Sequence, residues 1–76
     1  MWWYFEKLNE TSNLILYAYG YESKEVTGQF EYDKIAEKAR IIKYANNHSE
    51  KEDIQHTAYI LVSEYGNLEK KTIAYG

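Results

Sequence analysis

A chain of 76 residues is expected to form one small domain, residues 1–76, with a core near the lower limit for independent folding. It contains no cysteine, which excludes disulfide bonds and thiolate chemistry, and it is tyrosine-rich, with nine tyrosines, two tryptophans and two phenylalanines. Twelve acidic and nine basic residues give a net charge of −3, which argues against a general affinity for polyanions.

The first predicted element is a strand over residues 2–8. It begins with four consecutive aromatic residues, Trp2-Trp3-Tyr4-Phe5, which favour a pleated backbone. Glu6 and Lys7 interrupt this run too early for the core of a signal peptide, and no apolar run in the chain is long enough to span a membrane. We therefore expect a soluble, cytoplasmic protein without membrane contact.

A polar loop over residues 9–13 joins this strand to a second one, residues 14–21, and the pattern predicts a hairpin. The second strand is apolar on both sides. One side carries Leu14, Leu16 and Ala18, and the other carries Ile15, Tyr17 and Tyr19. A strand with two apolar sides belongs in the middle of a sheet.

The third predicted strand, residues 26–32, has one polar side, because its apolar residues alternate with Thr27, Gln29 and Glu31. Residues 33–45 are compatible with two structures. Ile35, Ala39 and Ile42 have helical spacing, which is one interpretation. The preferred interpretation is a turn over 33–37 and a fourth strand over 38–45, which contains strand-favouring isoleucine and tyrosine.

A helix is predicted from Ser49 onwards, because Ser49-Glu50-Lys51-Glu52 has the form of a capping box. Apolar residues then recur at helical spacing, namely Ile54, Ala58, Leu61, Val62 and Tyr65. Gly66 suits the left-handed residue that often follows a helix. The last segment, residues 70–75, is β-prone, and it is compatible with an edge strand or with a tail.

Together these elements predict an α+β fold, in which an antiparallel meander of about four strands carries the C-terminal helix on one face. The other face would stay uncovered, and apolar faces of this kind mark sites of protein association. We assign to that uncovered face the expected partner-binding residues, which are Trp3, Phe5, Ile15, Tyr17 and Tyr19. A symmetric homodimer would bury them, and a different protein partner is the alternative.

The sequence predicts no catalytic, metal or cofactor site. Glu52 and His56 share one side of the predicted helix, but it is opposite Ile54 and Leu61, and two ligands on an exposed turn do not complete a metal site. His48 is placed in a polar loop before the helix. A glycine-flanked serine and a phosphate-binding glycine loop are both missing from the sequence.

A non-enzymatic module for protein interaction or self-assembly is therefore the function we expect. The alternative is a domain that binds single-stranded nucleic acid through residues 34–44, because four basic residues there accompany tyrosines on which bases could stack. The basic residues are Lys34, Lys38, Arg40 and Lys43, and the tyrosines are Tyr32 and Tyr44. These lysines are also typical of an edge strand that avoids aggregation, and this is the preferred interpretation. A small enzyme is a third interpretation.

Overall fold

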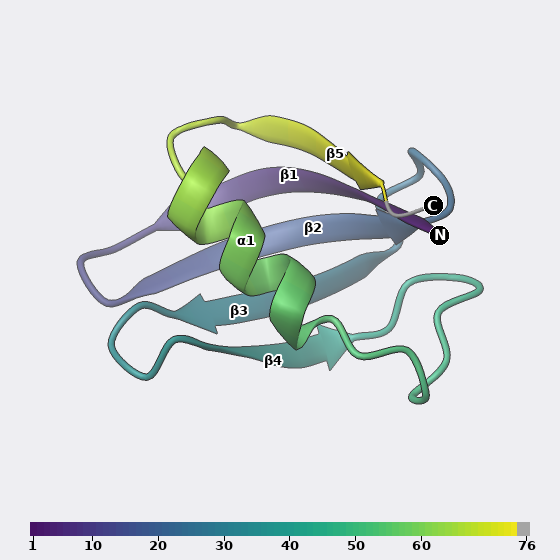
Figure 1. Cartoon of the computed structure of the whole chain (residues 1–76), viewed down its shortest axis with the longest axis horizontal. Helices are drawn as coiled ribbons and strands as arrows, with labels where there is room; N and C mark the ends of the chain where they lie inside the picture. Colours follow the sequence, from purple (N-terminus) through teal and green to yellow (C-terminus); the bar gives the residue numbers. More distant parts are fainter. Residues whose placement is uncertain (75–76) are drawn as a thin grey trace.

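The computed structural model describes residues 1–74 and shows an antiparallel sheet crossed by one helix (Figure 1). The elements in chain order are β1 (Trp2–Glu10), β2 (Leu14–Tyr21), β3 (Gly28–Asp33), β4 (Lys38–Lys43), α1 (Gln55–Tyr65) and β5 (Lys70–Ala74). The strands lie in the order β4-β3-β2-β1-β5, and all neighbouring pairs are antiparallel.

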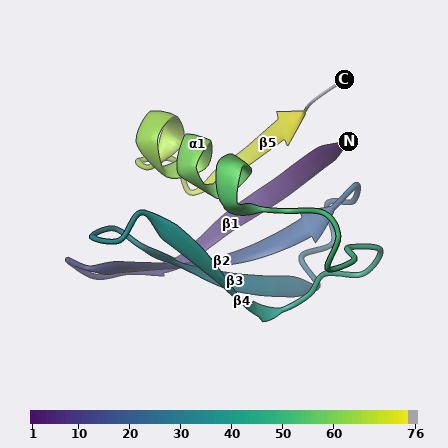
Figure 2. The same cartoon turned by 60° about the horizontal axis from the view of Figure 1, so that its bottom comes forward.

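The predicted α+β class and the helix on one face are confirmed. Figure 2 shows α1 on one side of the sheet, and no other helix or strand of residues 1–74 covers the opposite side. The sheet has five strands rather than about four, because the C-terminal segment pairs with β1 and becomes an edge strand. Of that predicted segment, Tyr75 lies outside the described residues. No helix of residues 1–74 is long and apolar enough to cross a membrane.

The ambiguous stretch after β3 is a turn followed by a strand, as preferred from the sequence. The Asp33 carboxylate accepts hydrogen bonds from the Ile35 and Ala36 amides at 2.9 and 3.0 Å, and Glu37 closes the turn with a φ of 57°. Because the Asp33 side chain bonds these two amides, the backbone forms a turn here and not a helix. The third strand begins at Gly28, two residues later than predicted, because Thr27 still donates to the Glu25 carbonyl in a turn.

The helix begins six residues later than the capping box predicted. The Glu52 carboxylate does accept from the Ser49 amide at 2.9 Å, but the box closes an isolated turn, in which the Glu52 amide bonds the Ser49 carbonyl. The helix itself starts at Gln55, whose amide donates to the Asp53 carboxylate at 2.9 Å. Gly66 ends the helix with a right-handed φ of −60°, so the predicted left-handed cap is wrong.

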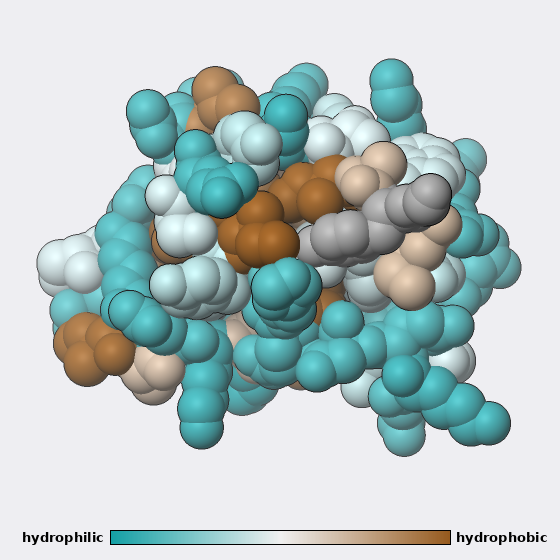
Figure 3. Space-filling view, viewed as in Figure 1, coloured by the Kyte–Doolittle hydropathy of each residue, from teal (hydrophilic) through white to brown (hydrophobic). Residues whose placement is uncertain are grey.

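The core lies between α1 and the sheet. Buried residues of the helix, which include Ala58 and Leu61, pack against large rings from the three central strands. Seen from the helix side, a small apolar area beside α1 is surrounded by polar side chains (Figure 3). The helix side of the sheet is therefore closed by the chain itself.

The residues assigned from the sequence to the uncovered face of the sheet lie on the helix-covered face, so that assignment is wrong. The helix covers Trp3, Phe5, Ile15, Tyr17 and Tyr19, and each of these side chains is at most 1% exposed. The physical reason is that β2 is apolar on both sides, so its alternation does not reveal which side a helix takes. The larger rings fill the volume under the helix, and the smaller Leu14, Leu16 and Ala18 face the other way.

Candidate interaction surface

The open face of the sheet is the side that α1 does not cover. Strand register fixes its residues: Tyr4 on β1 is opposite Gly20 on β2 and Thr72 on β5, and Glu6 is opposite Ala18 and Lys70. Its centre is an apolar group that we call the open-face stripe, made of Trp2, Tyr4, Leu14, Leu16 and Ala18. Leu14 is 39% exposed, and Trp2, Tyr4 and Leu16 are half-buried.

Charged residues border the stripe on both sides. On the β5 side, Lys70 lies 3.8 Å from the Glu6 carboxylate, which also accepts a hydrogen bond from the Tyr4 hydroxyl at 3.1 Å. On the β3 and β4 side, Arg40 forms an ion pair with Glu31. An apolar centre inside a charged rim is the usual composition of a protein interface.

One end of the open face is partly covered by the loop between β2 and β3. A side chain at Gly20 would collide with the Ser23 carbonyl oxygen and lie 2.5 Å from that of Glu25, so glycine is required where this loop folds back. Glu22 begins the loop with a φ of 52°. The rest of the open face has no such cover among the described residues, and the sheet is wide: the molecule measures 31 by 21 Å across the view of Figure 1.

The basic and aromatic region 34–44 does not form one continuous platform. Lys34 is held at the hairpin end, where its Nζ donates to the Glu10 carboxylate at 2.5 Å and to the Thr11 carbonyl at 2.9 Å. Tyr32 is 3% exposed and belongs to the core. Register places Lys38, Arg40 and Lys43 on the open side of β4. Tyr44 is 41% exposed, but its ring packs against His48.

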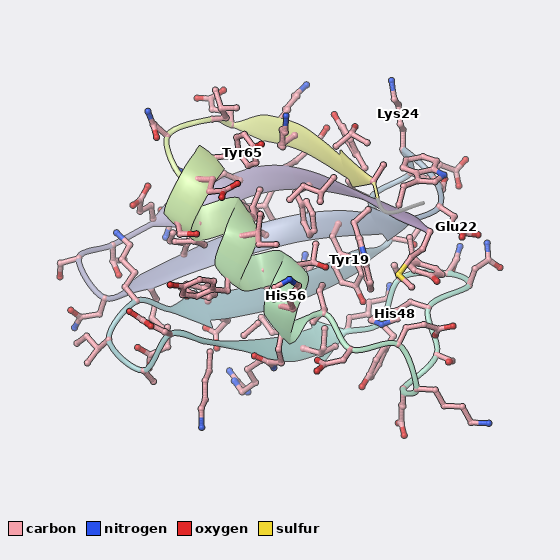
Figure 4. All side chains as sticks on the ribbon, viewed as in Figure 1. Tyr19, Glu22, Lys24, His48, His56 and Tyr65 are labelled. Atoms are coloured by element: carbon pink, nitrogen blue, oxygen red, sulfur yellow. The ribbon has the colours of Figure 1, made fainter. Side chains whose placement is uncertain are left out.

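His48 is the buried titratable residue that sequence reasoning missed. It is 7% exposed, and Figure 4 shows it beside Tyr19. Its Nε2 lies 2.7 Å from the Glu52 carbonyl oxygen, which can only accept, so this nitrogen carries a proton. Its Nδ1 lies 2.5 Å from the Tyr19 hydroxyl, which accepts a hydrogen bond from the Ala45 amide at 3.1 Å.

Aromatic rings enclose the His48 imidazole. Trp3 and Tyr44 have ring centroids 5.0 Å away, and Tyr21 stacks on it at 5.4 Å. The role of His48 is to anchor the loop after β4 on the core. The sequence around His48 carries no signal of this, because most of its neighbours come from β1 and β2.

His56 and Glu52, the two side chains that share one side of the predicted helix, do not belong to the core. His56 is exposed on the outer side of α1 (Figure 4), away from the sheet. The Glu52 carboxylate is engaged by Ser49, whose hydrogen bonds hold the pKa of Glu52 below its usual range. Within residues 1–74, no three histidine, aspartate or glutamate side chains are grouped so as to hold a metal ion.

A groove of about 520 Å³ lies beside the C-terminal end of α1. Glu10 is its central charge: its carboxylate accepts from Lys34 and from Lys7, and these two bonds lower its pKa to about 2. Lys7 also donates to the Gly66 carbonyl at the end of the helix. Lys7 therefore connects the helix end to the first hairpin, and Lys34 connects the β3–β4 turn to it.

Comparison of the chain with protein-family models, with curated proteins and with solved structures finds no match.

Proposed function

We propose that this protein is a non-enzymatic, cytoplasmic interaction module that self-associates through the open face of its sheet. The observation that supports the proposal is the open-face stripe, an apolar group inside a charged rim on the side that the helix leaves uncovered. Leu14 is exposed and Trp2, Tyr4 and Leu16 are half-buried, whereas Ala18 is 5% exposed. Apolar surface rimmed by polar residues marks association sites.

A second copy of the chain is the partner that this face suits best. A two-fold axis brings the same patch of both subunits together, so one apolar stripe supplies both halves of the interface. The rim carries Glu31 and Asp33 on β3 beside Lys38 and Arg40 on β4. A rim of one sign would repel a second copy, whereas this rim carries both signs.

The size of the face also suits a dimer. A stable interface buries about 800 Å² per partner, and the extents of the whole molecule, 31 by 21 Å, set an upper limit of that order for any one face. Sheet-on-sheet packing would then form a second apolar layer on the side opposite α1. The core of a 76-residue chain is near the lower limit for independent folding, and the second layer would add stability to it.

Sedimentation equilibrium over a wide concentration range tests the proposal. We expect the parent to approach twice the chain mass, and we expect Leu14→Lys to remain monomeric, because lysine would lose its water in the interface. Ile35→Lys is the matched control, since Ile35 is 77% exposed on the turn before β4 and lies outside the stripe. A parent that stays monomeric at the highest concentration would refute self-association.

The alternative function, binding of single-stranded nucleic acid, draws on the row formed by Lys38, Arg40 and Lys43 on β4. Its weakness is that Glu31 already pairs with Arg40 and that Tyr32 is buried. Titration of a fluorescent single-stranded oligonucleotide distinguishes the two functions. We expect no binding at physiological salt, whereas micromolar binding that weakens steeply with salt would favour the alternative.

A further inference from the structure

The first residue of α1 makes an unusual contact with the edge of the sheet. The Gln55 carboxamide oxygen accepts a hydrogen bond from the Ala39 amide at 2.8 Å, and its nitrogen donates to the Ala39 carbonyl at 2.5 Å. Ala39 is opposite Tyr32 in the β3–β4 ladder, and β4 is the edge strand. Its amide and carbonyl therefore point away from β3, toward the side where a further strand would lie.

A carboxamide has the same donor and acceptor as a peptide group. Gln55 consequently gives Ala39 both hydrogen bonds that the backbone of a neighbouring strand would give. Edge strands with unpaired amides and carbonyls are templates for another chain, and proteins block them with covering groups, charges and bulges. Here one side chain takes the place of the missing strand.

The position of Gln55 is fixed by the rest of the helix start. Its own amide is bonded to the Asp53 carboxylate at 2.9 Å, and the residue before it, Ile54, is 3% exposed in the core. The Ala58 amide donates to the Ile54 carbonyl at 2.8 Å, which joins that anchor to the first turn of α1. The carboxamide is thus held against β4 by the docking of α1 itself.

Two further features of β4 act in the same direction. The register shifts between Gln29 and Phe30 of β3, which places a bulge near Ile42 and leaves only a short regular stretch around Ala39. Lys38, Arg40 and Lys43 add charge along the strand. Gln55 therefore occupies Ala39, which lies within the regular stretch that these features leave available.

We propose that Gln55 is an edge guard, which keeps β4 from pairing with β4 of another copy of the chain. The inference does not depend on the open-face dimer, because it concerns the edge of the sheet and not its face. Removal of the carboxamide would free the Ala39 amide and carbonyl for an incoming strand, whose backbone would replace both lost hydrogen bonds.

Amide hydrogen exchange at Ala39 tests the contact directly. We expect Gln55→Ala to raise the exchange rate of the Ala39 amide about tenfold, since the loss of one hydrogen bond corresponds to a change of that order. Gln55→Glu keeps an acceptor for that amide but loses the donor to the carbonyl, so it should change the rate less. His56→Ala, an exposed neighbour on α1, is the control and should leave the rate unchanged.

The guarding role is tested by sedimentation in the Leu14→Lys background, in which the open face is not available for association. We expect Leu14→Lys with Gln55→Ala to form larger species and Leu14→Lys with His56→Ala to form none. If the double variant Leu14→Lys with Gln55→Ala is monomeric although its Ala39 amide exchanges freely, the edge guard is overturned. Unchanged exchange would overturn the contact itself. If Leu14→Lys alone stays dimeric, the proposed open-face dimer is refuted. The difference in size between the two double variants would still show whether Gln55 blocks pairing at β4.

Discussion

At the residue scale, single polar contacts decide how segments that are distant in the sequence are held together. Glu10 joins the first hairpin to the β3–β4 turn through Lys34, and it orients Lys7 toward the end of α1. Tyr19 joins β2 to the loop after β4 through His48 and the Ala45 amide. Gly28 permits the close passage of that loop, because a side chain there would lie 2.5 Å from the Ala45 nitrogen.

Glu10 should make the protein sensitive to acid. The two lysine bonds lower its pKa to about 2 from the ordinary 4.5. Its contribution is therefore fully present above pH 4.5 and is lost as the pH falls through 2. Urea unfolding between pH 6 and pH 2 should show a smaller loss of stability for Glu10→Gln than for the parent. Because the carboxylate is 39% exposed, added salt should reduce the difference. Parallel pH profiles at low salt would contradict this role.

The hydrogen bonds of the Tyr19 hydroxyl should contribute more to the free energy of unfolding than a typical surface hydrogen bond does. Tyr19→Phe leaves the Ala45 amide and His48 Nδ1 without their partner inside the core. We expect a loss of about 1–3 kcal/mol in the free energy of unfolding. Tyr59→Phe is the control, since Tyr59 is 45% exposed on α1. Equal urea midpoints for the two variants would show that the buried network contributes nothing.

At the element scale, the sequence predicts which elements exist better than where the helix begins. Aromatic and β-branched composition, with alternation in the third segment, correctly predicts strand character in four segments, and helical spacing is matched by the burial of Ile54, Ala58 and Leu61. The capping box fails as a start signal because Ser49 and Glu52 satisfy each other in a separate turn. After that turn Ile54 packs into the core, and the helix starts beyond it. This depends on distant contacts that no local pattern contains.

The displaced helix start yields a test at the same scale. Asp53 accepts from the Gln55 amide, which is unpaired within the helix, so Asp53→Ala should cost about 1 kcal/mol. Ser49→Ala should cost only a few tenths of a kcal/mol, because its turn is exposed. Thermal unfolding of both variants decides between the two starts. A larger effect at Ser49 than at Asp53 would restore the capping box as the beginning of the helix.

At the scale of the whole molecule, the two-layer arrangement follows from the order of elements, but the choice of face does not. β1 and β2 each present apolar side chains on both sides, so the sequence shows that a second apolar face exists without showing which residues form it. The structure assigns the rings of β2, including Tyr17, to the helix side and Leu16 to the open side, where Trp2 and Tyr4 of β1 also lie. The helix thus leaves one face of the sheet uncovered, and the residues on that face differ from those assigned from the sequence.

Neighbouring residues of β2 test this account most directly, because Leu16 and Tyr17 point to opposite faces. Sedimentation equilibrium with circular dichroism should find the parent dimeric and Leu16→Lys folded but monomeric. Tyr17→Lys should be unfolded, since Tyr17 is 1% exposed and a buried lysine costs at least about 3 kcal/mol. A folded, monomeric Tyr17→Lys beside a dimeric Leu16→Lys would contradict the account, because it would place the interface on the face assigned here to the core.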